Sequence, residues 1–69
     1  MLITVYGEAR EVEAELTVEG LLLQLGIKAE RVAVEVNLEV IRRDQRGERR
    51  LAPGDAVEIV SFVGGGSGC

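Results

Sequence analysis

The chain contains no histidine and only one cysteine, one proline and two aromatic residues among its 69 positions. A lone cysteine, Cys69, excludes a disulfide within the chain, and the absence of histidine excludes a Cys/His metal cluster. Catalysis by a nucleophile paired with a histidine is excluded for the same reason. With Tyr6 and Phe62 as its only aromatics, the chain also lacks a stacking platform for nucleic-acid bases.

Long apolar runs are missing as well. No stretch approaches the ~18 apolar residues of a membrane span, and residues 1–8 lack the basic region and apolar run of a signal peptide. We therefore expect a cytoplasmic protein without a membrane partner.

The formal net charge of −4 argues against general binding of nucleic acid and suits a basic protein partner. The charge is uneven, because residues 42–50 carry five arginines and two acidic residues, a local +3 that leaves −7 elsewhere. A solvated loop is the simplest interpretation of that segment.

Hydrophobic periodicity divides the first third of the chain into three elements. Residues 1–6 and 11–16 alternate in polarity, which predicts two strands joined by a turn at Gly7-Glu8, with the glutamates of the second strand facing solvent. Helical spacing then follows Thr17, the predicted N-cap, and ends at Gly26. Gly20 stands where a capping box has Glu or Gln, and its missing side chain permits close packing on the sheet.

Three more strands are predicted at residues 32–36, 40–41 and 56–63, with a polar surface loop over 42–50 and a turn over 51–55. A right-handed crossover through the helix places the third strand in the same sheet. The order predicts an α+β fold, the β-grasp (ubiquitin-like) roll. It has a mixed four- to five-stranded sheet with one main helix packed on one face. Residues 1–63 form this domain, and residues 64–69 are predicted to be a flexible glycine-rich tail.

The last predicted strand presents alternate side chains to the two faces of the sheet. If residues 57 and 59 face the helix, residues 60 and 62 lie on the open face, next to the tail. An apolar patch there is a candidate surface for partner docking, although small proteins also expose apolar side chains without function. The predicted docking residues are Val60, Phe62, Tyr6 and Ala33.

The tail begins with the glycine run Gly64-Gly65-Gly66. Because glycine lacks Cβ, such a backbone can enter a narrow channel and approach a reactive centre closely. On composition alone, a frayed terminus or a linker is the favoured alternative. No catalytic constellation stands out, since Glu13 and Glu15 lie on a predicted exposed face. The residues therefore argue against a stand-alone enzyme.

Several short segments occur in a characteristic order and spacing: Val5-Tyr6-Gly7-Glu8, Val32-Ala33-Val34-Glu35-Val36-Asn37, Gly54-Asp55 and Phe62-Val63-Gly64-Gly65-Gly66. With the predicted fold, they make residues 1–66 resemble the ThiS family, the sulfur carrier proteins of thiamine biosynthesis. The short length and the ending resemble this family more than the related small subunit of molybdopterin synthase.

The resemblance implies a mechanism in which the partners supply the catalytic groups. An E1-like adenylyltransferase (ThiF-like) would use ATP and Mg²⁺ to adenylate the carboxylate of Gly66, with Gly64 and Gly65 threading into its channel. A sulfur donor would then form the thiocarboxylate, and a thiazole synthase (ThiG-like) would accept the sulfur. The chain itself is expected to bind no metal or cofactor.

The sequence departs from the family at its end, where family members usually stop at the diglycine. Here Ser67, Gly68 and Cys69 follow, so the carbonyl of Gly66 belongs to a peptide bond and cannot be adenylated. A protease could remove the three residues, the extension could be engineered, or Cys69 could carry other chemistry, such as a persulfide. Tyr6 also occupies a position where the family often has Asn.

Two further alternatives remain open. Ubiquitin-like carriers with a protease-trimmed tail serve cysteine or homocysteine synthesis, and related carriers serve molybdopterin synthesis. A ubiquitin-like protein modifier would instead join Gly66 to a lysine of its target.

Overall fold

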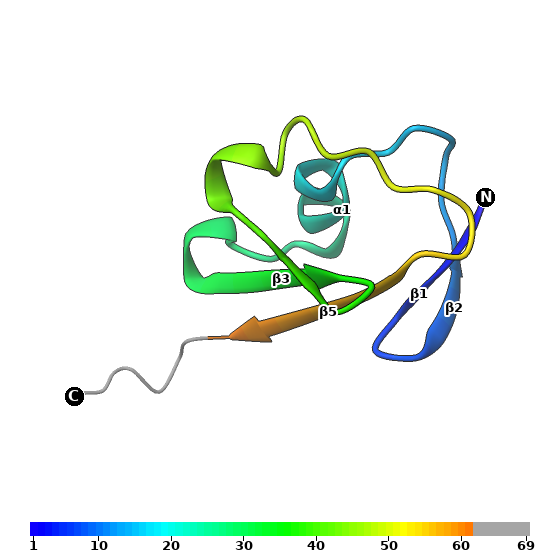
Figure 1. Cartoon of the computed structure of the whole chain (residues 1–69), viewed down its shortest axis with the longest axis horizontal. Coiled ribbons are helices and arrows are strands. Elements are labelled where there is room, and N and C mark those ends of the chain that lie inside the picture. Colours follow the sequence, from blue (N-terminus) through cyan, green and yellow to red (C-terminus); the bar gives the residue numbers. More distant parts are fainter. Residues whose placement is uncertain (62–69) are drawn as a thin grey trace.

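The computed structural model describes residues 1–61. In this part of the chain, five strands form one mixed sheet in the order β2-β1-β5-β3-β4, and helix α1 packs on one face of it (Figure 1). The elements are β1 (Leu2–Val5), β2 (Glu8–Glu11), α1 (Val18–Leu25), the 3₁₀ turn η1 (Ala29–Arg31), β3 (Val32–Val36), β4 (Glu39–Ile41), the 3₁₀ turn η2 (Arg43–Gln45) and β5 (Ala56–Ser61). The predicted β-grasp roll is confirmed.

The second strand lies earlier in the chain than predicted. The hairpin turns at Tyr6 and Gly7, both with positive φ (55° and 80°), as a two-residue turn of type I′ requires. Such a turn pairs Val5 directly with Glu8, so β2 covers Glu8–Glu11 and not residues 11–16. Residues 12–17 leave the sheet, and the alternation there reflects only the burial of Val12 and Leu16 in the core.

Helix α1 begins and ends where the sequence predicts. The hydroxyl of Thr17 accepts a hydrogen bond from the Gly20 amide at 3.0 Å, which satisfies one free amide of the first turn. Gly26 adopts the left-handed conformation (φ 72°), and the Ile27 amide donates to the Leu22 carbonyl at 3.0 Å, as in a Schellman motif. A Cβ on Gly20 would lie 2.8 Å from Leu16 Cδ1, so the close packing predicted at Gly20 is against Leu16 and not the sheet.

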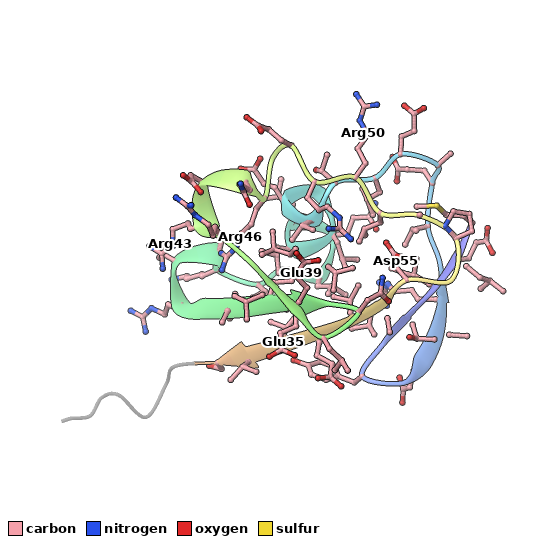
Figure 2. All side chains as sticks on the ribbon, viewed as in Figure 1. Glu35, Glu39, Arg43, Arg46, Arg50 and Asp55 are labelled. Atoms are coloured by element: carbon pink, nitrogen blue, oxygen red, sulfur yellow. The ribbon has the colours of Figure 1, made fainter. Side chains whose placement is uncertain are left out.

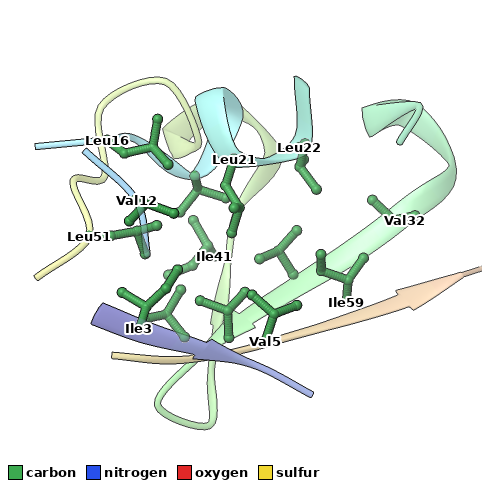
Figure 3. Packing of buried hydrophobic residues seen from close by; sticks show 14 residues of the cluster. Ile3, Val5, Val12, Leu16, Leu21, Leu22, Val32, Ile41, Leu51 and Ile59 are labelled. Atoms are coloured by element: carbon green, nitrogen blue, oxygen red, sulfur yellow. The ribbon is translucent and has the colours of Figure 1, made fainter. Parts of the chain in front are cut away.

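The core lies between α1 and the inner face of the sheet, as Figure 3 shows. Strand β3 contributes every second residue, which matches its predicted alternation. The largest fully buried side chains come from both layers: Ile3, Val18, Leu21, Leu22, Val34, Val36 and Val57. The inner face of the sheet is therefore largely covered by α1, whereas the outer face is open.

The segment over residues 42–50 is more than the surface loop that was predicted. Its backbone caps the helix, because the carbonyls of Arg49 and Arg46 accept from the amides of Val18 and Glu19, each at 3.0 Å. The Arg46 side chain is only 5% exposed and donates to the carbonyls of Ala29 (2.8 Å) and Val32 (2.6 Å). Sequence reasoning missed this, because hydropathy assigns every arginine to the surface.

The predicted C-terminal strand is confirmed from Ala56 to Ser61. Phe62 and Val63, which the prediction included, lie outside the described residues, as does the tail from Gly64 to Cys69. The division into a domain over 1–63 and a tail over 64–69 therefore stays a prediction.

Candidate functional site

Strand β5 connects the centre of the sheet to the glycine run. It pairs in parallel with β1 at Thr4–Ala56 and Val5–Val57, and antiparallel with β3 as far as Val32–Ser61. Asn37 fixes its start, because its side-chain oxygen accepts from the Ala56 amide at 3.0 Å. In Figure 1, β5 points toward one end of the molecule. The described part of the chain therefore finishes at that end of the molecule, at Ser61.

The open face of β5 carries part of the predicted docking patch. Val60 is 50% exposed and lies directly opposite Ala33, whereas Val57 and Ile59 are buried against the helix side. The structure thus brings Val60 and Ala33 together on the outer face. Phe62 lies beyond the described residues, and the docking role of all these residues stays a prediction.

Tyr6 is placed differently from Val60. It belongs to the hairpin turn, and its hydroxyl donates a hydrogen bond to the Ile59 carbonyl, beyond the last residue of β1. The ring is 61% exposed and lines a pocket on the helix side of the sheet. Tyr6 therefore contacts β5 from the hairpin turn. Its expected orientation on the same face as Ala33 stays a prediction.

The pocket beside Tyr6 has a volume of about 290 Å³ and lies between the hairpin and the C-terminal end of α1. Its lining consists of Val5, Tyr6, Glu8, Ala9, Arg10, Leu25 and Ile27. No cluster of three or more His, Cys, Asp or Glu residues suited to a metal ion occurs within residues 1–61. Nor does that part of the chain contain a helix long and apolar enough to cross a membrane.

Two like charges face each other at the middle of the open face. Glu35 of β3 lies directly opposite Glu58 of β5, and on its other side Glu35 faces the exposed Val40 of β4. Neither glutamate takes part in the ion pairs found among the described residues. Like charges in directly opposed positions destabilise a sheet. Sequence reasoning missed this pair and Val40, because both depend on strand register.

We expect Glu58→Lys to stabilise the folded chain by about 1 kcal/mol, because the substitution replaces a repulsive pair by an attractive one. Urea denaturation at low salt would measure the gain, which should shrink as salt screens the charges. The matched control is Glu39→Lys, at another exposed strand position, which faces Val36 instead of a carboxylate. An equal gain in both variants would assign the effect to net charge.

The comparisons with known proteins agree with this architecture. The family model described as the ThiS family matches residues 3–66. A thiazole synthase of Paramagnetospirillum magneticum is 43% identical over 67 residues, which are 97% of this chain but 21% of that protein. The chain thus spans about a fifth of that relative. The sulfur carrier protein ThiS of Bacillus subtilis is 40% identical over 50 residues, 72% of this chain and 76% of its own length.

A solved structure shows the same arrangement. The crystal structure of the thiamine biosynthesis protein ThiS from Geobacter metallireducens superposes with a TM-score of 0.84 at 40% identity, covering 96% of this chain and 100% of its own. A ubiquitin-like β-grasp domain whose central strand leads into glycines defines the class of protein. The family match makes that class specific: the chain belongs to the ThiS family of sulfur carrier proteins.

Proposed function

We propose that this chain carries sulfur for thiazole formation in thiamine biosynthesis, as a thiocarboxylate at Gly66. The observation that carries the proposal is the ThiS-family match over residues 3–66, which includes the whole glycine run. The central position of β5 supports it, because the strand that precedes the glycines in the chain is anchored on both sides, by β1 and β3. The thiazole synthase relative favours thiamine over the cysteine, molybdopterin and protein-modifier alternatives.

The proposed chemistry has three steps, each carried out with a partner. On an E1-like adenylyltransferase, a carboxylate oxygen of Gly66 attacks the α-phosphorus of Mg²⁺-bound ATP, and pyrophosphate leaves. A sulfide-level donor then attacks the acyl carbon, and AMP leaves, so that a thiocarboxylate forms. Adenylation is needed because a carboxylate is a poor electrophile without a good leaving group. A ThiG-like thiazole synthase then accepts the sulfur. We propose that these reactions take place in the cytoplasm.

The chain's own contribution is recognition and delivery. Gly64 and Gly65 have no side chains to obstruct a narrow channel, so the backbone can carry Gly66 to the reacting phosphate. Val60 of β5 and Ala33 of the neighbouring β3 give the enzyme an apolar surface on the strand that precedes the glycines. Binding energy on the domain can thereby position a carboxylate several residues away.

Intact mass spectrometry tests this proposal directly. A chain ending at Gly66 should gain the mass of an oxygen-to-sulfur replacement when incubated with the cognate ThiF-like enzyme, ATP, Mg²⁺ and sulfide. Samples without ATP should stay unchanged. A subsequent loss of this sulfur to the cognate thiazole synthase would distinguish thiamine synthesis from the alternatives. Absence of any sulfur gain with active enzyme would refute the carrier function.

The exposed side chain of Val60 is expected to contribute to docking. Val60→Asp should raise the KM of the carrier for adenylation about tenfold, because a buried carboxylate would lack a partner in the complex. The variant should lose only about 1 kcal/mol of stability, because Asp suits a central strand poorly but Val60 lies outside the core. Leu23→Asp is the matched control, at an apolar residue of α1 that is 75% exposed. A similar rise in both variants would argue against a specific docking face.

A further inference from the structure

Positive charge is concentrated at one end of this acidic protein. Residues 28–31 and 42–46 together contain five basic and two acidic residues, a net +3, in a chain whose total is −4. Four of the five basic side chains are exposed, and we refer to these as the basic surface: Lys28, Arg31, Arg42 and Arg43. The other, Arg46, is buried beneath them.

The two segments of the basic surface are held together by specific hydrogen bonds. The buried Arg46 donates to the carbonyls of Ala29 and Val32, at the two ends of η1. Arg43 donates to the Glu30 carbonyl at 3.0 Å. Burial lowers the pKa of the Arg46 guanidinium, and the neighbouring positive charge of Arg43 lowers that pKa further. The fold therefore gathers like charges here despite their repulsion.

The basic surface lies where β5 leaves the sheet. Arg31 immediately precedes Val32, which pairs with Ser61, the last residue of β5. Arg42 follows Ile41, which pairs with Val34, so β4 leads its arginines toward the same end of the sheet. Figure 2 shows Arg43 and Arg46 at the end of the molecule toward which β5 points.

We propose that the basic surface docks against a carboxylate-rich protein surface beside the channel that receives the C-terminal residues in the adenylyltransferase. This inference rests on the proposed function and adds a second recognition element to it. Charge complementarity of this kind steers association and fixes orientation. It would align the strand with the channel before the glycines enter.

If the C-terminal residues enter the channel extended, the target of the basic surface is the enzyme and not the nucleotide. In an extended chain, the five residues from 62 to 66 span about 17 Å. That exceeds the screening length of about 8 Å at physiological ionic strength. The basic surface at Ser61 thus faces the enzyme around the channel entrance, whereas the phosphates of ATP meet Gly66.

The test compares two double variants that each remove two positive charges. Arg31→Gln/Arg42→Gln removes two of the four charges of the basic surface and keeps the hydrogen bonds of Arg43 and Arg46. The control, Arg10→Gln/Arg50→Gln, changes residues of β2 and of the segment before β5. Binding of a Gly66-ended chain to the cognate adenylyltransferase would be measured by calorimetry at low and high salt, with thiocarboxylate formation followed in parallel. Thermal denaturation would verify that both variants are folded.

We expect Arg31→Gln/Arg42→Gln to weaken binding about tenfold at low salt, with a much smaller effect at high salt. The control should stay within about twofold of the unsubstituted chain. Equal weakening in both variants, or no weakening in the first, would overturn the inference, as would an absence of binding by the unsubstituted chain. Salt-sensitive binding through the basic surface without sulfur transfer would instead refute the proposed function and retain the docking surface.

Discussion

A chain that ends at Gly66 is expected to accept sulfur, and the chain that continues through Cys69 is expected to accept none at Gly66. The physical reason is that adenylation requires a carboxylate oxygen, whereas the Gly66 carbonyl of the longer chain belongs to an amide. This difference is all-or-none and does not depend on how tightly the domain docks. Any Ser67-to-Cys69 extension must therefore be removed before the proposed chemistry can occur.

A series of chains ending at Gly65, Gly66, Ser67 and Cys69 would measure this dependence. All four share the described domain, so differences in sulfur gain report on the terminus alone. The chain ending at Ser67 has a free carboxylate but bears a side chain, and we expect its rate to fall at least about tenfold, because a channel suited to glycine excludes it. Fragment masses would locate the sulfur. A persulfide on Cys69 would contradict the proposed site and favour chemistry at the thiol.

Substitution of Arg46 is expected to produce the largest loss of stability among single changes in the 42–50 segment. Arg46→Ala removes two charge-assisted hydrogen bonds and leaves the carbonyls of Ala29 and Val32 without these donors, at a cost of about 3 kcal/mol. A 69-residue domain has roughly 7 kcal/mol of stability in total. The loss is moderated because burying the guanidinium itself costs free energy.

Urea denaturation of three variants separates the contributions. Arg46→Met keeps an apolar stem and should lose about 2 kcal/mol, less than Arg46→Ala. Arg43→Ala, which removes one exposed hydrogen bond to Glu30, should lose less than about 1 kcal/mol. If Arg46→Met were as stable as the unsubstituted chain, packing of the apolar stem would account for the whole contribution of Arg46 to stability. The guanidinium would then contribute no net stability.

The sequence predicted correctly those helices and strands that are determined by residues close together in the chain. Thr17 and Gly26 bound α1 because their capping interactions involve neighbours within the same turns. Strand β3 was predictable because its alternate valines meet the core. The fold class followed from the order of these elements.

Features that depend on distant contacts were not predictable in the same way. Residues 11–16 alternate as a strand would, yet Val12 and Leu16 reach the core from a segment outside the sheet. The burial of Arg46 requires two carbonyls from η1 and β3, and the opposition of Glu35 and Glu58 requires the register of β3 on β5. Within the site, alternation correctly placed Val60 opposite Ala33, whereas the contact of Tyr6 with Ile59 depends on the hairpin turn and could not be predicted from alternation.

The central position of β5 has a consequence for the order of events during synthesis. Strand β5, the last strand among the described residues, must insert between β1 and β3, which are made much earlier, so the sheet cannot close until Ser61 has left the ribosome. The closing contact between β1 and β5 joins the two ends of the described chain and is the slowest kind to form. A chain that stops before β5 thus lacks the middle of its sheet. Only chains that contain β5, the strand that precedes the glycines, can therefore complete the sheet.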